Sequence, residues 1–127
     1  MSVEETLKRL FAAWSSGDAD APGAYVTEDF RLCDTAFAQE CNGWPAAREF
    51  FAYAMALNPG VCMQPKDIWL TDEPDLAIVR WLMTGSNADT GKPWEVEGLS
   101  TLRFRDGLVC EEIDYYTPTP VQQAAEA

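Results

Sequence analysis

Residues 94–116 read WEVEGLSTLRFRDGLVCEEIDYY, which is two runs of alternating side chains joined by Arg105-Asp106-Gly107. Alternation with a period of two is typical of half-buried β-strands, and Asp-Gly is a favoured hairpin turn. We therefore predict an antiparallel hairpin with strands over residues 94–105 and 108–116. In the first strand, one face carries the residues expected to point into the core: Trp94, Val96, Gly98, Ser100, Leu102 and Phe104.

The last strand has a mixed inner face. By the same alternation it presents Leu108, Cys110, Glu112, Asp114 and Tyr116 on one side, opposite Val109, Ile113 and Tyr115. Leu108 and Cys110 are core-type residues, which predicts that this side faces inward and takes Glu112 and Asp114 with it. A slip of one residue in the register would instead expose Asp114.

The rest of the chain places helices before strands. Apolar spacing predicts a first helix through Leu7, Leu10, Phe11 and Trp14, a short second one after Asp20-Ala21-Pro22, and a third over residues 43–56. A short strand at residues 30–33 precedes the third helix, and strands over 62–70 and 76–87 follow it. This order predicts an α+β fold, with three front helices on the concave face of a strongly curved, mainly antiparallel sheet that encloses a pocket. Residues 1–118 would form one domain, and residues 119–127, rich in Pro, Gln and Ala, a loose tail.

Composition excludes several functions. The 127 residues are 47% hydrophobic and carry a net charge of −12, which argues against nucleic-acid and anionic-membrane partners. Histidine is absent, so Ser-His-Asp and Cys-His catalysis and His-ligated metals are excluded. The four cysteines are scattered, and no metal site is expected. The N-terminus lacks a signal-peptide pattern, so we expect reduced thiols and a cytoplasmic protein.

Two motifs resemble a known superfamily. In the first, a Thr27-Glu28-Asp29 turn leads to a strand ending in Asp34, followed by Gly43-x-x-Ala46-x-Arg48-Glu49-Phe50. The second is Gly107-Leu108-Val109-x-x-x-x-Asp114-Tyr115-Tyr116. Together they resemble the nuclear-transport-factor-2-like superfamily, in particular ketosteroid isomerase and the SnoaL-like polyketide cyclases. The resemblance implies a cone-like α+β barrel, a small hydrophobic ligand, no cofactor, and a homodimer formed through the outer sheet face around Leu99 and Ile113.

The resemblance also implies two catalytic residues. Asp34 falls on the position of the isomerase's general base, and Asp114 on the last-strand position of the catalytic Asp in SnoaL-like cyclases and limonene-type epoxide hydrolases. Leu10 and Ser100 stand where the isomerase has its oxyanion-hole Tyr and protonated Asp. The residues expected to contact substrate are Leu10, Trp14, Phe51, Trp81, Ser100, Glu112 and Tyr116. The alternative for Asp34 is a structural role in capping its turn.

Three functions remain open from the sequence. The first is cofactor-independent acid/base chemistry of isomerase, cyclase or lyase type, performed by buried carboxylates on a small apolar or aromatic metabolite. The second is a non-catalytic binder of a hydrophobic ligand or partner. The third is epoxide hydrolysis, with Asp114 activating water and Arg80 orienting it. Arg80 lies in the run 77–83, which is apolar on both faces, so it could pair with Asp114 or lie on the outer face.

Overall fold

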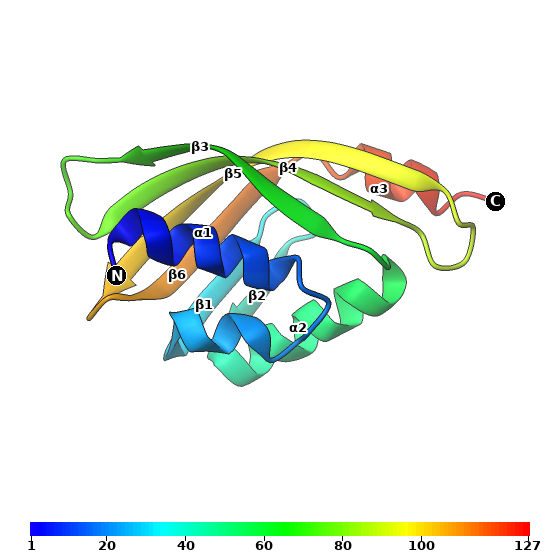
Figure 1. Ribbon diagram of the computed structural model, residues 1–127. Coiled ribbons are helices and arrows are strands. Elements are labelled where there is room, and N and C mark those ends of the chain that lie inside the picture. Colours follow the sequence, from blue (N-terminus) through cyan, green and yellow to red (C-terminus); the bar gives the residue numbers. More distant parts are fainter.

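The computed structural model describes all 127 residues and contains one six-stranded sheet in the order β2-β1-β6-β5-β4-β3. The strands are β1 (Val26–Asp34), β2 (Gln39–Asn42), β3 (Cys62–Leu70), β4 (Leu76–Ser86), β5 (Pro93–Arg105) and β6 (Leu108–Tyr116). Only β1 and β6 pair in parallel, and every other neighbouring pair is antiparallel. The sheet is strongly curved and does not close (Figure 1).

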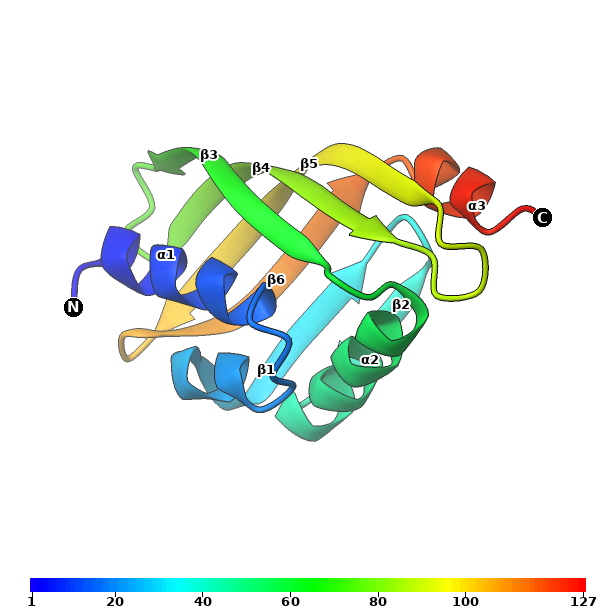
Figure 2. The same ribbon diagram turned by 45° about the vertical axis from the view of Figure 1, so that its right-hand side comes forward.

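The helices cover the concave side of this sheet. Helix α1 (Val3–Trp14) and helix α2 (Trp44–Leu57) lie beneath it, as both views show (Figures 1 and 2). The short 3-10 helix η1 (Ala21–Tyr25) joins α1 to β1. The predicted α+β fold is confirmed. None of the helices is long and apolar enough to cross a lipid bilayer.

The core forms where α1 meets the middle of the sheet. Leu7, Leu10 and Phe11 are fully buried on α1, which begins where the Ser2 hydroxyl accepts a hydrogen bond from the Glu5 N–H. The sheet side of the core is formed by Ala77, Val79, Trp81, Leu102 and Val109. Burial of this apolar stripe stabilises α1 far more than intrinsic helix propensity would.

The last strand differs from the expected alternation at its beginning. Phe104 lies opposite Val109 and Arg103 opposite Glu111, which leaves Cys110 as an extra residue in β6. This β-bulge reverses the alternation. Val109 is therefore fully buried, whereas Leu108 and Cys110, predicted to face inward, are only half-buried. Beyond the bulge, Glu112 and Asp114 point into the concave side, as expected.

Two further elements were not predicted. Strand β2 pairs with the end of β1, where Asp34 lies opposite Gln39, in a stretch for which no strand was predicted. The prediction of a loose tail is wrong for residues 119–124, which form helix α3 (Thr119–Ala124). The Thr90 hydroxyl donates to the Ala124 carbonyl, and Ala124 is buried in the core cluster. Tertiary contacts hold a short helix that its composition alone does not favour.

Candidate functional site

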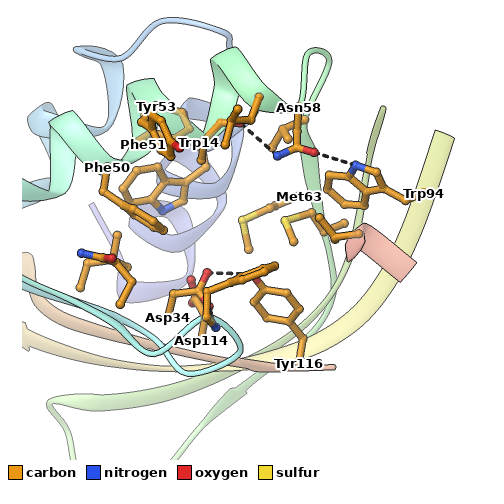
Figure 3. Close-up of a pocket in the computed structure, with 18 of the residues that line it drawn as sticks. Trp14, Asp34, Phe50, Phe51, Tyr53, Asn58, Met63, Trp94, Asp114 and Tyr116 are labelled. Atoms are coloured by element: carbon orange, nitrogen blue, oxygen red, sulfur yellow. Dashed lines mark hydrogen bonds between the residues drawn. The ribbon is translucent and has the colours of Figure 1, made fainter. Parts of the chain in front are cut away.

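A cavity of about 540 Å³ lies between the helices and the concave face of the sheet, and 16 of its 24 lining residues are hydrophobic. Eight of the lining residues are aromatic. Figure 3 shows Trp14, Phe50, Phe51 and Tyr53 above the sheet, Trp94 across from them at the right, and Tyr116 below, near Asp34 and Asp114. The Trp14 and Phe51 rings meet edge to face, with centroids 4.7 Å apart. A cavity of this size and character is typical of small-molecule sites.

Three carboxyl groups gather at the sheet side of the cavity. In the parallel register of β1 and β6, Asp34 lies opposite Asp114, and Asp114 lies opposite Ser100 of β5. Glu112 precedes Asp114 by two residues and therefore shares its face of β6. Asp34, Glu112 and Asp114 are only 7%, 1% and 9% exposed. Burial of three carboxyls together is costly, so at least one of them must hold a proton near neutral pH.

Asp114 is oriented by a relay of two side chains. The Ser100 hydroxyl donates to Asp114 Oδ1 at 2.5 Å, and the Trp81 indole N–H donates to Ser100 Oγ at 2.8 Å. Burial raises the pKa of Asp114 to about 6, although hydrogen bonds from Glu112 and Ser100 favour its charged form. A carboxyl with this pKa can exchange protons near physiological pH.

Glu112 holds its proton most firmly. Its side chain accepts a hydrogen bond from the Trp14 indole N–H at 3.1 Å. Burial, and next the negative charge of Asp114, raise the pKa of Glu112 well above its usual value. The hydrogen bond between the two carboxyls also raises the Glu112 pKa and lowers that of Asp114. Glu112 is thus the donor and Asp114 the acceptor when the pair carries one negative charge.

Asp34 is held by a phenol and by its own turn. The Tyr116 hydroxyl donates to Asp34 Oδ2 at 2.7 Å, and the Phe37 backbone N–H donates to Oδ1 at 3.2 Å. Asp34 therefore caps its turn and also lines the cavity. Burial raises its pKa, and the hydrogen bond from Tyr116 partly opposes this. Burial and the nearby Asp34 carboxylate raise the pKa of Tyr116, so the phenol keeps its proton.

Most of the residues selected from the sequence lie around one cavity. Its lining includes Asp34 and Asp114 and, of the expected substrate contacts, Trp14, Phe51, Trp81, Glu112 and Tyr116. Two expected contacts do not line it. Leu10 is fully buried in the core beneath α1, and Ser100 is fully buried behind Asp114.

Arg80 lies on the outer face of the sheet. Its neighbours in sequence, Val79 and Trp81, are fully buried, so alternation turns Arg80 outward. There it pairs with Asp67 at 2.7 Å and with Glu97 at 3.1 Å. A pair between Arg80 and Asp114 is therefore excluded, and the epoxide hydrolase interpretation loses its orienting cation.

Several lining residues were missed by the sequence analysis. Phe37 comes from the β1–β2 turn, and Val121, Gln122 and Ala125 come from the C-terminal segment. Helical spacing marks the apolar face of α2, where Phe50 lies, but it does not separate core residues from cavity residues. No local signal marks Phe37 or the C-terminal residues, because only the tertiary fold brings them to the cavity. No group of three acidic or cysteine side chains is arranged to hold a metal ion.

The fold and the cavity define a small α+β protein with a largely apolar internal cavity. The family model of the SnoaL-like domain matches residues 7–112. The chain therefore belongs to the SnoaL-like family of the nuclear-transport-factor-2-like superfamily. No curated protein is similar enough in sequence to count as a match.

Solved structures share this fold at low sequence identity. A hypothetical protein from Catenulispora acidiphila with a ketosteroid isomerase-like fold, in complex with trimethylamine, is 19% identical, with a TM-score of 0.88 over 98% of this chain and 94% of that one. A protein from Jannaschia sp. CCS1 assigned as a SnoaL-like polyketide cyclase is 21% identical, with a TM-score of 0.83 over 98% and 92%. IdmH from Streptomyces antibioticus, also assigned as a polyketide cyclase, is 19% identical, with a TM-score of 0.81 over 95% and 96%.

Proposed function

We propose that the cavity binds a small apolar or aromatic metabolite and performs cofactor-independent acid/base chemistry of isomerase, cyclase or lyase type on it. The observation that carries this proposal is Asp114, a carboxyl on the lining of an apolar cavity with its pKa raised to about 6. Family membership and the Catenulispora complex with trimethylamine support small-molecule binding on this fold. A cytoplasmic location is part of the same proposal.

Asp114 acts as the general base in this mechanism. Above pH 6 it is mostly ionised, and it takes a proton from a C–H or O–H group of the bound molecule. Ser100 and Trp81 fix its orientation, and the apolar walls hold the reacting atom against it. Protonated Asp114 then returns the proton to another atom of the same molecule, so the reaction needs no other reactant. Asp34, with Tyr116 bound to it, is a second carboxylate within the same cavity.

Asp114→Asn tests the proposal, because it keeps the shape of the side chain and removes its titrating group. The ligand is first identified by mass spectrometry of small molecules that co-purify with the protein, and its conversion is then followed. We expect kcat to fall at least 100-fold while the ligand Kd changes less than about threefold. For the wild type, kcat/KM should rise with pH and level off above about pH 6. The exposed Asp72→Asn serves as the control.

The competing function is a non-catalytic binder, and one observation favours it. The carboxylates of Asp34 and Asp114 already accept hydrogen bonds from Tyr116 and Ser100, as purely structural carboxylates would. Under that function the wild type binds the co-purified molecule and leaves it unchanged. Normal turnover by Asp114→Asn would contradict the role of Asp114.

A further inference from the structure

The polar groups beside the carboxyls leave no hydrogen-bond donor free for a ligand. The Tyr116 hydroxyl donates to Asp34, the Trp14 indole to Glu112, the Trp81 indole to Ser100, and the Ser100 hydroxyl to Asp114. The protonated carboxyl of Glu112 donates its hydrogen bond to Asp114. The hydrogen-bonding positions that remain for a ligand are carboxylate oxygens, which can only accept hydrogen bonds when ionised.

The amide side chains of the lining do not change this conclusion. Asn58 uses one N–H on the Ala54 carbonyl and accepts from the Trp94 indole. Asn58 and Tyr53 lie across the cavity from Asp34 and Asp114 (Figure 3), so their remaining donors are not beside the carboxyls. Gln39 and Gln122 are exposed and Asn87 is half-exposed, so water competes for their amide groups. The carboxyl side of the cavity is therefore an acceptor site.

The charge of the cavity points the same way. Its lining contains four acidic residues, Asp34, Asp89, Glu112 and Asp114, and no Lys or Arg. The whole chain carries a net charge of −12 and has no histidine. An anionic ligand would lose its hydration in this cavity and gain no cation, while buried carboxylates repel it.

We propose that the cavity selects a non-anionic ring compound that presents its own hydrogen-bond donor, a hydroxyl or an N–H, to Asp34 and Asp114, and that it rejects carboxylates, sulfonates and phosphates. This rests on the binding part of the proposed function and not on turnover. A ligand whose only polar atom near Asp34 and Asp114 is an acceptor, such as a ketone or ether oxygen, finds no partner there. Apolar rings fill the aromatic walls in either case, so selection comes from the polar group.

Two matched pairs of probes test the proposal at pH 8. The first pair is N-phenyl-1-naphthylamine and its sulfonate, 8-anilinonaphthalene-1-sulfonate, which share their rings and their N–H. The second pair is 2-naphthol and 2-methoxynaphthalene, in which a methyl group replaces the hydrogen of the hydroxyl donor. Probe or tryptophan fluorescence gives each Kd. We expect the neutral amine to bind at least tenfold more tightly than its sulfonate, and the naphthol at least threefold more tightly than its ether.

Ala54→Trp tests whether the probes are selected in this cavity, because Ala54 lines the cavity and a larger side chain there fills it. We expect this variant to abolish both preferences. Preferences that persist in Ala54→Trp, a sulfonate that binds as tightly as the amine, or an ether that binds as tightly as the naphthol would each overturn the proposal.

The wild type at pH 5 provides a second measurement that needs no variant in the carboxyl cluster. Below about pH 6 Asp114 gains a proton and becomes a donor. The groups that face it are Asp34 on β1, Glu112 and Tyr116 on β6, and uncharged Ser100 on β5. The ratio of the two Kd values in each probe pair should therefore be smaller at pH 5 than at pH 8. Unchanged ratios would contradict the role given to Asp114. These binding measurements require no turnover. A protein that shows both preferences but converts no ligand would therefore refute the proposed reaction and leave the proposed ligand selection intact.

Discussion

At the scale of single residues, negative charge on the buried carboxyl cluster lowers the stability of the folded state. Asp114 has a pKa of about 6 in the folded protein, above the value of about 3.9 expected in an unfolded chain. The folded state thus binds the Asp114 proton more tightly than the unfolded state does. The stability that this proton adds to the folded state is complete below about pH 4. That contribution is lost as pH rises through about 6. The raised pKa values of Asp34 and Glu112 act in the same direction.

Asp114→Asn should therefore stabilise the protein at pH 8. The uncharged amide removes the buried charge and still accepts the hydrogen bond from Ser100. We expect the free energy of unfolding to rise by about 1–3 kcal/mol at pH 8 and to change little at pH 4. Urea unfolding at both pH values measures this. Exposed Asp72→Asn should show no such pH-dependent gain, and an equal gain in both variants would indicate a general effect of net charge.

At the scale of elements, β6 and α3 decide the shape of the cavity. The bulge at Cys110 changes which residues of β6 face inward, so that Val109 packs in the core while Glu112 and Asp114 reach the cavity. Helix α3 lies at the far end of the sheet from the N-terminus, where the C-terminal segment contributes Val121, Gln122 and Ala125 to the lining (Figure 2). Ala124 is the one buried residue of this helix.

Ala124→Asp should release α3 from the sheet without unfolding the domain. A charge at this buried position loses its hydration, and α3 is too short to be stable unpacked. We expect the Kd of N-phenyl-1-naphthylamine to rise at least threefold while the circular dichroism of the sheet is retained. Gln123→Asp adds the same charge at an exposed position of the same helix and should leave the Kd unchanged. Equal effects of the two variants would contradict a packing role for α3.

At the scale of the whole molecule, the outer face of the sheet carries apolar side chains. Leu99 of β5 lies opposite Tyr115 of β6, and they are 40% and 46% exposed. Trp69 of β3 is also exposed, and it lies opposite half-buried Ile78 of β4. Such residues on one sheet face favour the homodimer implied by the family resemblance. Dimerisation through this face remains a prediction.

Sedimentation at micromolar concentration tests the homodimer. We expect the wild type to sediment as a dimer and Leu99→Glu as a monomer, because a charge at the centre of an apolar interface costs association free energy. Asp72→Lys changes charge at an exposed position in the loop between β3 and β4, away from the outer face of the sheet, and should leave the dimer intact. A monomeric wild type would reject the interface.

The sequence by itself determined the order of elements and the inward position of Ser100. The inward position of Asp114 was predicted correctly, although Leu108 and Cys110, on which that prediction rested, lie before the point where the bulge reverses the alternation. Local periodicity carries this information: helical spacing marked α1 and α2, and alternation in β5 and in the end of β6 turned Ser100 and Asp114 toward the concave side. The net charge argued against nucleic-acid and anionic-membrane partners, and the absence of histidine excluded histidine-dependent catalysis and metal ligation. These properties of the sequence do not depend on the fold. The motifs around Asp34 and Asp114 indicated the superfamily to which the chain belongs.

Only the tertiary structure decided how these residues meet. The β-bulge, strand β2 and the packing of α3 arise from contacts between segments far apart in sequence, for which short windows hold no signal. The outward turn of Arg80 was undecidable locally, since both faces of β4 are apolar. The hydrogen bonds from the Trp14 and Trp81 indoles to Glu112 and Ser100 join four elements, α1, β4, β5 and β6. Long-range packing therefore set the pKa of Asp114, because that pKa depends on burial and on neighbours that the chain order does not reveal.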